Sequence, residues 1–116
     1  MTRKNVVKEK SFTFACEIVS LYKLLIERKE FVLSRQLLRS GTSIGANIRE
    51  SEQAESRQDF IHKLAIALKE ANETDYWLEL LLATNFISDV EFKSVQPKLS
   101  ELLRLLTRII NTTKNK

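Results

Sequence analysis

Residues 60–82, FIHKLAIALKEANETDYWLELLL, decide the fold of this chain. Apolar residues recur there every three or four positions, which is the spacing of one face of an α-helix. The line consists of Ile61, Leu64, Leu68, Ala71, Asp75, Leu78 and Leu82. We therefore predict a long helix from about Ser56 to Ala83 or Thr84. Asp75 is the anomaly of this line, because a carboxylate in a buried seam needs a partner.

The composition extends the helical prediction to the whole chain. Only two glycines and one proline occur in 116 residues, whereas a β-rich fold of this size needs many turns. A hydrophobic fraction of 43% and a charged fraction of 29% are ordinary for one globular domain. The sequence thus predicts an all-α protein.

Two helices are predicted before residue 56. The first runs from about Ser11, its N-cap, to Arg28, and the second runs from Phe31 or Leu33 to Ala54.

A fourth helix is predicted near the end of the chain. It begins near Ser88, and Pro97 either bends it or starts a new helix after a short turn over residues 88–95. Because short loops join the helices, we expect an antiparallel up-down-up-down four-helix bundle over residues 11–111.

The two ends of the chain are polar. We predict a flexible basic N-terminus over residues 1–10 and a flexible tail over residues 112–116. The longest apolar runs, such as Leu80–Ala83, are far too short to cross a bilayer, and the N-terminus lacks the apolar stretch of a signal peptide. We expect a cytoplasmic protein without a membrane partner.

The predicted first helix carries two adjacent apolar stripes. One contains Phe14, Ile18, Leu21 and Leu25, and the other contains Phe12, Ala15, Val19, Tyr22 and Ile26. One stripe is enough to face the core of a bundle. The second needs other cover, which indicates self-association.

Small residues mark the predicted second helix. Gly41 and Gly45 lie four apart, hence on one face, and each costs about 1 kcal/mol against alanine. We expect close packing there, either of a neighbouring helix with Ala67 and Ala71 at the same level or of a ligand, although Gly41 could also break the helix. The same register places Glu73 and Asp75 level with Arg35 and Arg39, which predicts structural ion pairs.

No catalytic residue, metal site or cofactor is predicted. Cys16 is the only cysteine and is expected to be a small buried hydrophobe. His62 is the only histidine, so a bundle metal site lacks its ligands, and we expect it to be exposed. No nucleophile–base–orienter set and no phosphate-binding loop occurs.

The basic residues form the remaining candidate site. The net charge is +4, a mild bias toward anionic partners. The predicted nucleic-acid-binding residues are Arg35, Arg39, Arg49, Lys23 and Arg28. They form either a phosphate-binding strip, which a symmetric oligomer would multiply, or ordinary ion pairs with nearby acids.

Two segments carry a family resemblance: residues 33–50, LSRQLLRSGTSIGANIRE, and residues 60–78. The stretch Ser40–Asn47 and the pair Glu73 and Trp77 are the specific parts. The sequence resembles the four-helix-bundle proteins encoded in intervening sequences of 23S ribosomal RNA genes. That family is similar in fold to the accessory variability determinants of diversity-generating retroelements, which are basic homopentamers that bind nucleic acid and a reverse transcriptase.

The resemblance implies a homo-oligomer, with a pentamer as the expected form, and affinity for RNA or DNA. It supplies no catalytic residues, and Pro97 departs from the pattern expected in the fourth helix. We therefore expect a non-enzymatic oligomeric bundle that binds nucleic-acid backbone. The alternative is a protein-interaction adaptor that receives a partner helix in the small-residue groove or on the spare apolar stripe.

Overall fold

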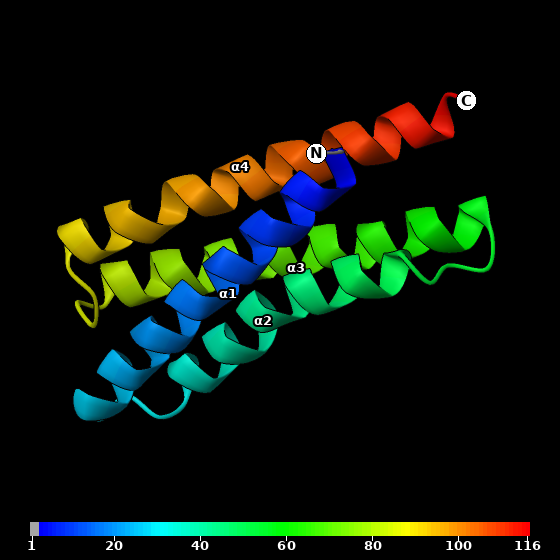
Figure 1. The fold of residues 1–116 in the computed structure, drawn as a ribbon. Coiled ribbons are helices and arrows are strands. Elements are labelled where there is room, and N and C mark those ends of the chain that lie inside the picture. Colours follow the sequence, from blue (N-terminus) through cyan, green and yellow to red (C-terminus); the bar gives the residue numbers. More distant parts are fainter. Residues whose placement is uncertain (1–2) are drawn as a thin grey trace.

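The computed structural model describes residues 3–116, with side chains from Val6 onward. It contains four helices, which are α1 (Arg3–Glu27), α2 (Leu33–Ser51), α3 (Arg57–Ala83) and α4 (Asp89–Lys114). They form the predicted all-α bundle, an elongated body of 46 × 22 × 21 Å (Figure 1).

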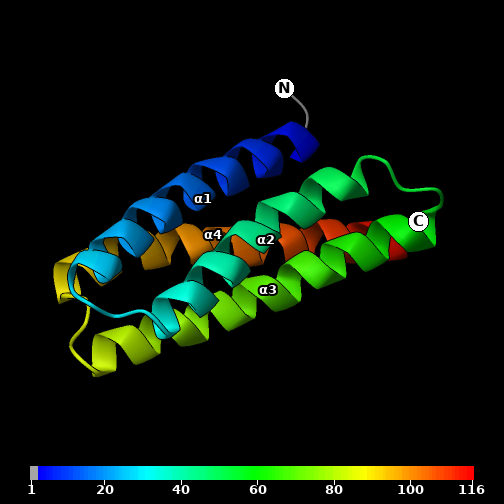
Figure 2. The ribbon, with the colours of Figure 1, turned by 90° about the horizontal axis from the view of Figure 1, so that it is seen from below.

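The helices pack in a ring, in which α2 contacts α1 and α3, and α4 contacts α3 and α1. The α1–α2 and α3–α4 connections lie at one end, and the α2–α3 connection lies at the other (Figures 1 and 2). The register of the antiparallel pair α2–α3 is fixed by two contacts. Lys63 lies 3.4 Å from Glu50 near the turn, and the buried Thr74 hydroxyl donates to the Ser40 hydroxyl at 2.9 Å farther along.

The predicted start of the first helix is wrong. α1 begins at Arg3, about two turns before the expected N-cap at Ser11. Val7 is buried in the core, and the buried Ser11 hydroxyl donates to the Lys8 carbonyl inside the helix. The expected flexible segment 1–10 is therefore helical from Arg3 onward, while Met1 and Thr2 lie outside the described residues.

The helix ends are defined by local hydrogen bonds. α3 is capped by Ser56, whose hydroxyl accepts from the Asp59 amide at 3.0 Å, and α4 has a complete capping box between Ser88 and Glu91. α4 continues without a break through Pro97, which lies on its exposed face, where water can bond the carbonyl that the proline ring leaves free. The helix ends at Lys114, inside the segment predicted to be a flexible tail.

The stripe of α1 that faces the core is the one with Phe14, Ile18 and Leu25, all almost fully buried. The second stripe is mostly half-buried, and only Phe12 stands out, with 56% of its surface exposed. The sequence therefore overstated the uncovered apolar surface of α1. What remains is an aromatic ring in solvent rather than a whole apolar face.

The two glycines of α2 pack against α1. A Cβ atom on Gly41 would lie 2.8 Å from Cγ2 of Ile18, and one on Gly45 would lie 3.3 Å from Oγ of Ser11. A neighbouring helix packs closely on both glycines, as predicted, but the nearest atoms belong to α1 rather than to the alanines of α3, and α2 is not broken at Gly41. The groove that an adaptor would offer to a partner helix is filled by the chain's own first helix.

Gly41→Ala should lower the free energy of unfolding by about 1–3 kcal/mol, because Ile18 is fully enclosed and cannot move away from the added methyl group. The cost should exceed the gain of about 1 kcal/mol in helix propensity. Urea unfolding followed by circular dichroism measures the change.

Gly45→Ala is the matched control, since its methyl group meets only the edge of Ser11 and should cost less. Equal stability of Gly41→Ala and the wild type would contradict the close packing of α1 on α2.

Candidate nucleic-acid interface

The five cations predicted to bind nucleic acid fall into two groups. Lys23, Arg35 and Arg49 are exposed, and among the side chains of residues 6–116 none of them has a carboxylate within ion-pair distance. Arg28 and Arg39 are instead held by carboxylates of neighbouring helices. The structure thus separates the five predicted cations into three without an ion pair and two that are paired with carboxylates.

Arg28 joins the end of α1 to the start of α4. Its two terminal nitrogens donate to the two carboxylate oxygens of Glu91 at 2.8 and 2.7 Å, and one also donates to the Phe86 carbonyl at 2.7 Å. This forked pairing fits the planar guanidinium. Arg28, followed by the Ser88 amide, lowers the pKa of Glu91 to about 2. The charge of Arg28 is therefore largely balanced by Glu91 of the same chain.

Arg39 belongs to a network between α2 and α3. Its guanidinium donates to Glu70 at 3.0 Å and to Glu73, and the Trp77 indole nitrogen donates to the same Glu73 oxygen at 2.9 Å. The Trp77 hydrogen bond and then Arg39 lower the pKa of Glu73. Because Glu73 and Trp77 lie one helical turn apart on α3, the Trp77 indole can reach the same Glu73 carboxylate that Arg39 binds.

Asp75 does not have the arginine partner that the sequence predicted. Its carboxylate accepts a long hydrogen bond, 3.5 Å, from the amide of Gln96 on α4, and within residues 6–116 no ion pair reaches it. The physical reason is its direction. Glu73 points from α3 toward α2, whereas Asp75, two residues on, points toward α4.

Phe12 and Arg49 form a cation–π pair on the outer side of α1 and α2. The guanidinium carbon lies 5.3 Å from the centre of the phenyl ring. Cys16 lies four residues after Phe12, and Lys23 lies seven residues after Cys16. The three residues therefore share one exposed face of α1, here called the outer strip of α1. The prediction that Cys16 is buried is therefore wrong, because its thiol faces outward.

Arg35 and Arg49 lie on the exposed side of α2. They are 14 residues apart, so about 21 Å of helix axis separates them. The outer strip of α1 with Arg35 and Arg49 forms the candidate interface, a surface with one exposed aromatic ring and three uncommitted cations. Sequence reasoning missed the Phe12–Arg49 contact, since only the packing of α1 on α2 brings the two residues together.

Within residues 6–116 no group of three or more histidine, cysteine, aspartate or glutamate side chains is arranged to hold a metal ion. In the part of the chain that the structure describes, no helix has the length and apolar character needed to cross a membrane.

These features define a class of protein, a basic four-helix bundle with exposed cations, three of which lie with Phe12 on its first two helices. Residues 3–108 match the family of 23S rRNA-intervening sequence proteins, and the chain belongs to this family. The chain is also similar to a Bacteroides thetaiotaomicron protein of unknown function from the S23 ribosomal protein family. That crystal structure is 60% identical in sequence, with a TM-score of 0.93 and coverage of 95% of this chain and 99% of that chain. A search of curated proteins gave no match.

Glu91→Gln should remove part of the acid sensitivity of the bundle. The carboxyl group of a glutamate in an unfolded chain has a pKa of about 4.3. A pKa of about 2 in the fold therefore gives stability that is present above pH 4.3 and is lost as the pH falls toward 2. The variant should be less stable at pH 7 by about 1 kcal/mol and should lose less stability between pH 5 and pH 2.

Urea midpoints measured at half-unit pH intervals provide the test. Glu79→Gln, which removes an exposed carboxylate of α3, is the matched control. An unchanged acid slope in Glu91→Gln would show that the Arg28–Glu91 pair does not join α1 to α4.

Proposed function

We propose that this chain is a non-enzymatic cytoplasmic protein that assembles with copies of itself, as a pentamer, and binds the phosphate backbone of RNA or DNA. The observation that carries the proposal is the outer strip of α1, where Phe12 is 56% exposed beside Arg49 and in line with Lys23. A phenyl ring in water is costly, and an arginine beside it is a common feature of protein interfaces.

Assembly is supported by the free energy of burying the Phe12 side chain. Covering the exposed part of Phe12, 56% of its surface, with a second copy would gain about 1–2 kcal/mol per subunit. Symmetric assembly would also repeat the exposed cations around a ring, so that weak single contacts act together on one polyanion.

Nucleic-acid affinity is supported by the net charge of +4 and by Lys23, Arg35 and Arg49. Arg28 and Arg39 contribute less, because their charges are opposed by Glu91, Glu70 and Glu73. No sequence preference is proposed, because phosphate contacts carry no base information.

Phe12→Glu should dissociate the assembly, since it places a charge where an apolar ring is proposed to be covered. Light scattering should give a wild-type mass several times the chain mass of 13.5 kDa and a variant mass close to one chain.

Tyr76→Glu is the matched control, because Tyr76 is an equally exposed aromatic residue, also 56%, on α3. A monomeric wild type, or a Phe12→Glu variant that keeps the wild-type mass, would contradict self-association through this strip.

Replacing Lys23, Arg35 and Arg49 together with glutamine should weaken binding to nucleic acid and flatten its salt dependence. For each phosphate that the variant no longer neutralises, the slope of log affinity against log salt should fall by about 0.7–0.9. Fluorescence anisotropy with a labelled RNA hairpin and a labelled DNA duplex, from low to physiological salt, measures the slope.

The control removes the same charge from exposed positions of α3 and α4, with Lys69, Lys93 and Arg104 changed to glutamine. The molar mass of both triple variants is first measured by light scattering, so that dissociation of the assembly is separated from weaker phosphate binding. Identical salt slopes for the two variants would contradict the assignment, and absence of binding by the wild type at low salt would remove the proposed function.

A further inference from the structure

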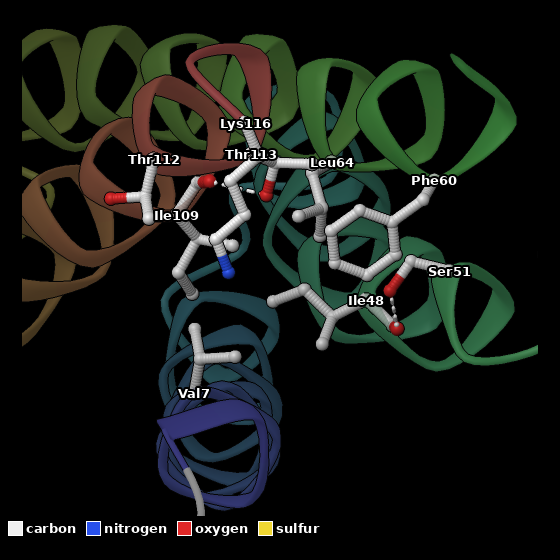
Figure 3. Close-up of a pocket in the computed structure, with 9 residues that line it drawn as sticks. All are labelled: Val7, Ile48, Ser51, Phe60, Leu64, Ile109, Thr112, Thr113 and Lys116. Carbon is white, nitrogen blue, oxygen red and sulfur yellow. Dashed lines mark hydrogen bonds between the residues drawn. The ribbon is translucent and has the colours of Figure 1, made fainter. Parts of the chain in front are cut away.

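A cavity of about 420 Å³ opens at the end of the bundle that holds the α2–α3 connection. All four helices contribute to it, and Figure 3 shows the side chains arranged around a central space. Its apolar walls are formed by Val7, Ile48, Phe60, Leu64 and Ile109. The volume lies in the range of small-molecule sites in proteins.

The helices leave this space because they do not end at the same level. α3 and α4 extend past the first turn of α1, so that the end of the seam between α3 and α4 lies beyond α1 (Figure 1). The space is open to solvent, so an apolar group that filled it would remove the apolar lining from water.

Two of the three hydroxyl groups at the cavity are bonded to their own helices, and Figure 3 shows the third, that of Thr112, pointing away from the other lining residues. The Ser51 hydroxyl donates to the Ile48 carbonyl, and the Thr113 hydroxyl donates to the Ile109 carbonyl at 2.7 Å. The interior therefore offers little polarity to a ligand, and the part of the ligand inside it must be apolar.

Lys116 supplies a positive charge to the cavity. Figure 3 shows its ammonium group turned toward the middle of the pocket. Among the side chains of residues 6–116 no carboxylate lies within ion-pair distance of it. A cation beside apolar walls suits a molecule that has an apolar body and an anionic head.

We propose that this cavity is a binding site for a small amphipathic carboxylate, of the medium-chain fatty-acid class. The hydrocarbon chain lies among Val7, Leu64 and Ile109, and the carboxylate pairs with Lys116. None of the residues that line the site belongs to the outer strip of α1, and the site does not rest on the proposed nucleic-acid function.

Decanoate, kept below its micelle concentration, is the probe, and decanol is its uncharged counterpart. Calorimetric titration of the wild-type protein should show saturable decanoate binding, and a large excess over Kd should raise Tm by several degrees. Lys116→Gln should weaken decanoate binding about two- to five-fold and leave decanol binding unchanged. Lys114→Gln, which changes an exposed lysine that does not line the cavity, is the control.

Ile109→Trp should abolish binding by filling the cavity, whereas Leu105→Trp, one turn earlier at another half-buried position of α4, should bind as the wild type does. Nuclear Overhauser contacts between decanoate and the methyl groups of Val7 and Leu64 locate the ligand even where a tryptophan variant does not fold. No saturable binding, wild-type binding by Ile109→Trp, or absence of these contacts would overturn the site. Unchanged decanoate affinity in Lys116→Gln would overturn the anionic class of ligand.

Discussion

The close contact of α1 with α2 at Gly41 is the constraint on which the rest of the surface depends. Because Gly41 has no side chain, Ile18 can lie directly against the α2 backbone. This contact fixes the rotation of α1 about its axis, with Phe14 and Leu25 in the core and Phe12 in solvent. The same rotation brings Arg49 over the Phe12 ring. A core packing requirement thus determines which residues of α1 can meet another molecule.

The fold was largely predictable, because helical periodicity and the lack of turn residues exclude most alternatives. The errors have local causes. The polar composition of residues 1–10 suggested fraying, but Val7 is held in the core, and a buried apolar anchor outweighs polar neighbours. Pro97 suggested a break, but Pro97 lies on the exposed side of α4, where water can bond the carbonyl that loses its helical partner and where the helix continues.

The candidate site was predictable only in part. The sequence identifies the cations of α1 and α2, but whether each is available depends on acids far away in the chain. Glu91 is 63 residues from Arg28, and Glu73 is 34 residues from Arg39. Only the packed bundle brings these groups together. Likewise, the predicted register of α2 and α3 placed Asp75 near Arg35 and Arg39. Asp75 lies two residues after Glu73, however, and this rotation about the axis of α3 points it toward Gln96 instead.

Cys16 allows a direct test of the central claim that the outer strip of α1 joins copies of the chain. Its thiol is exposed in the single chain, one turn from Phe12. The rate of maleimide labelling should be slow at protein concentrations where the assembly forms and should rise on dilution as the chains separate. Fast labelling that does not depend on protein concentration would contradict the claim, because the strip would then be open to solvent in every state of the protein.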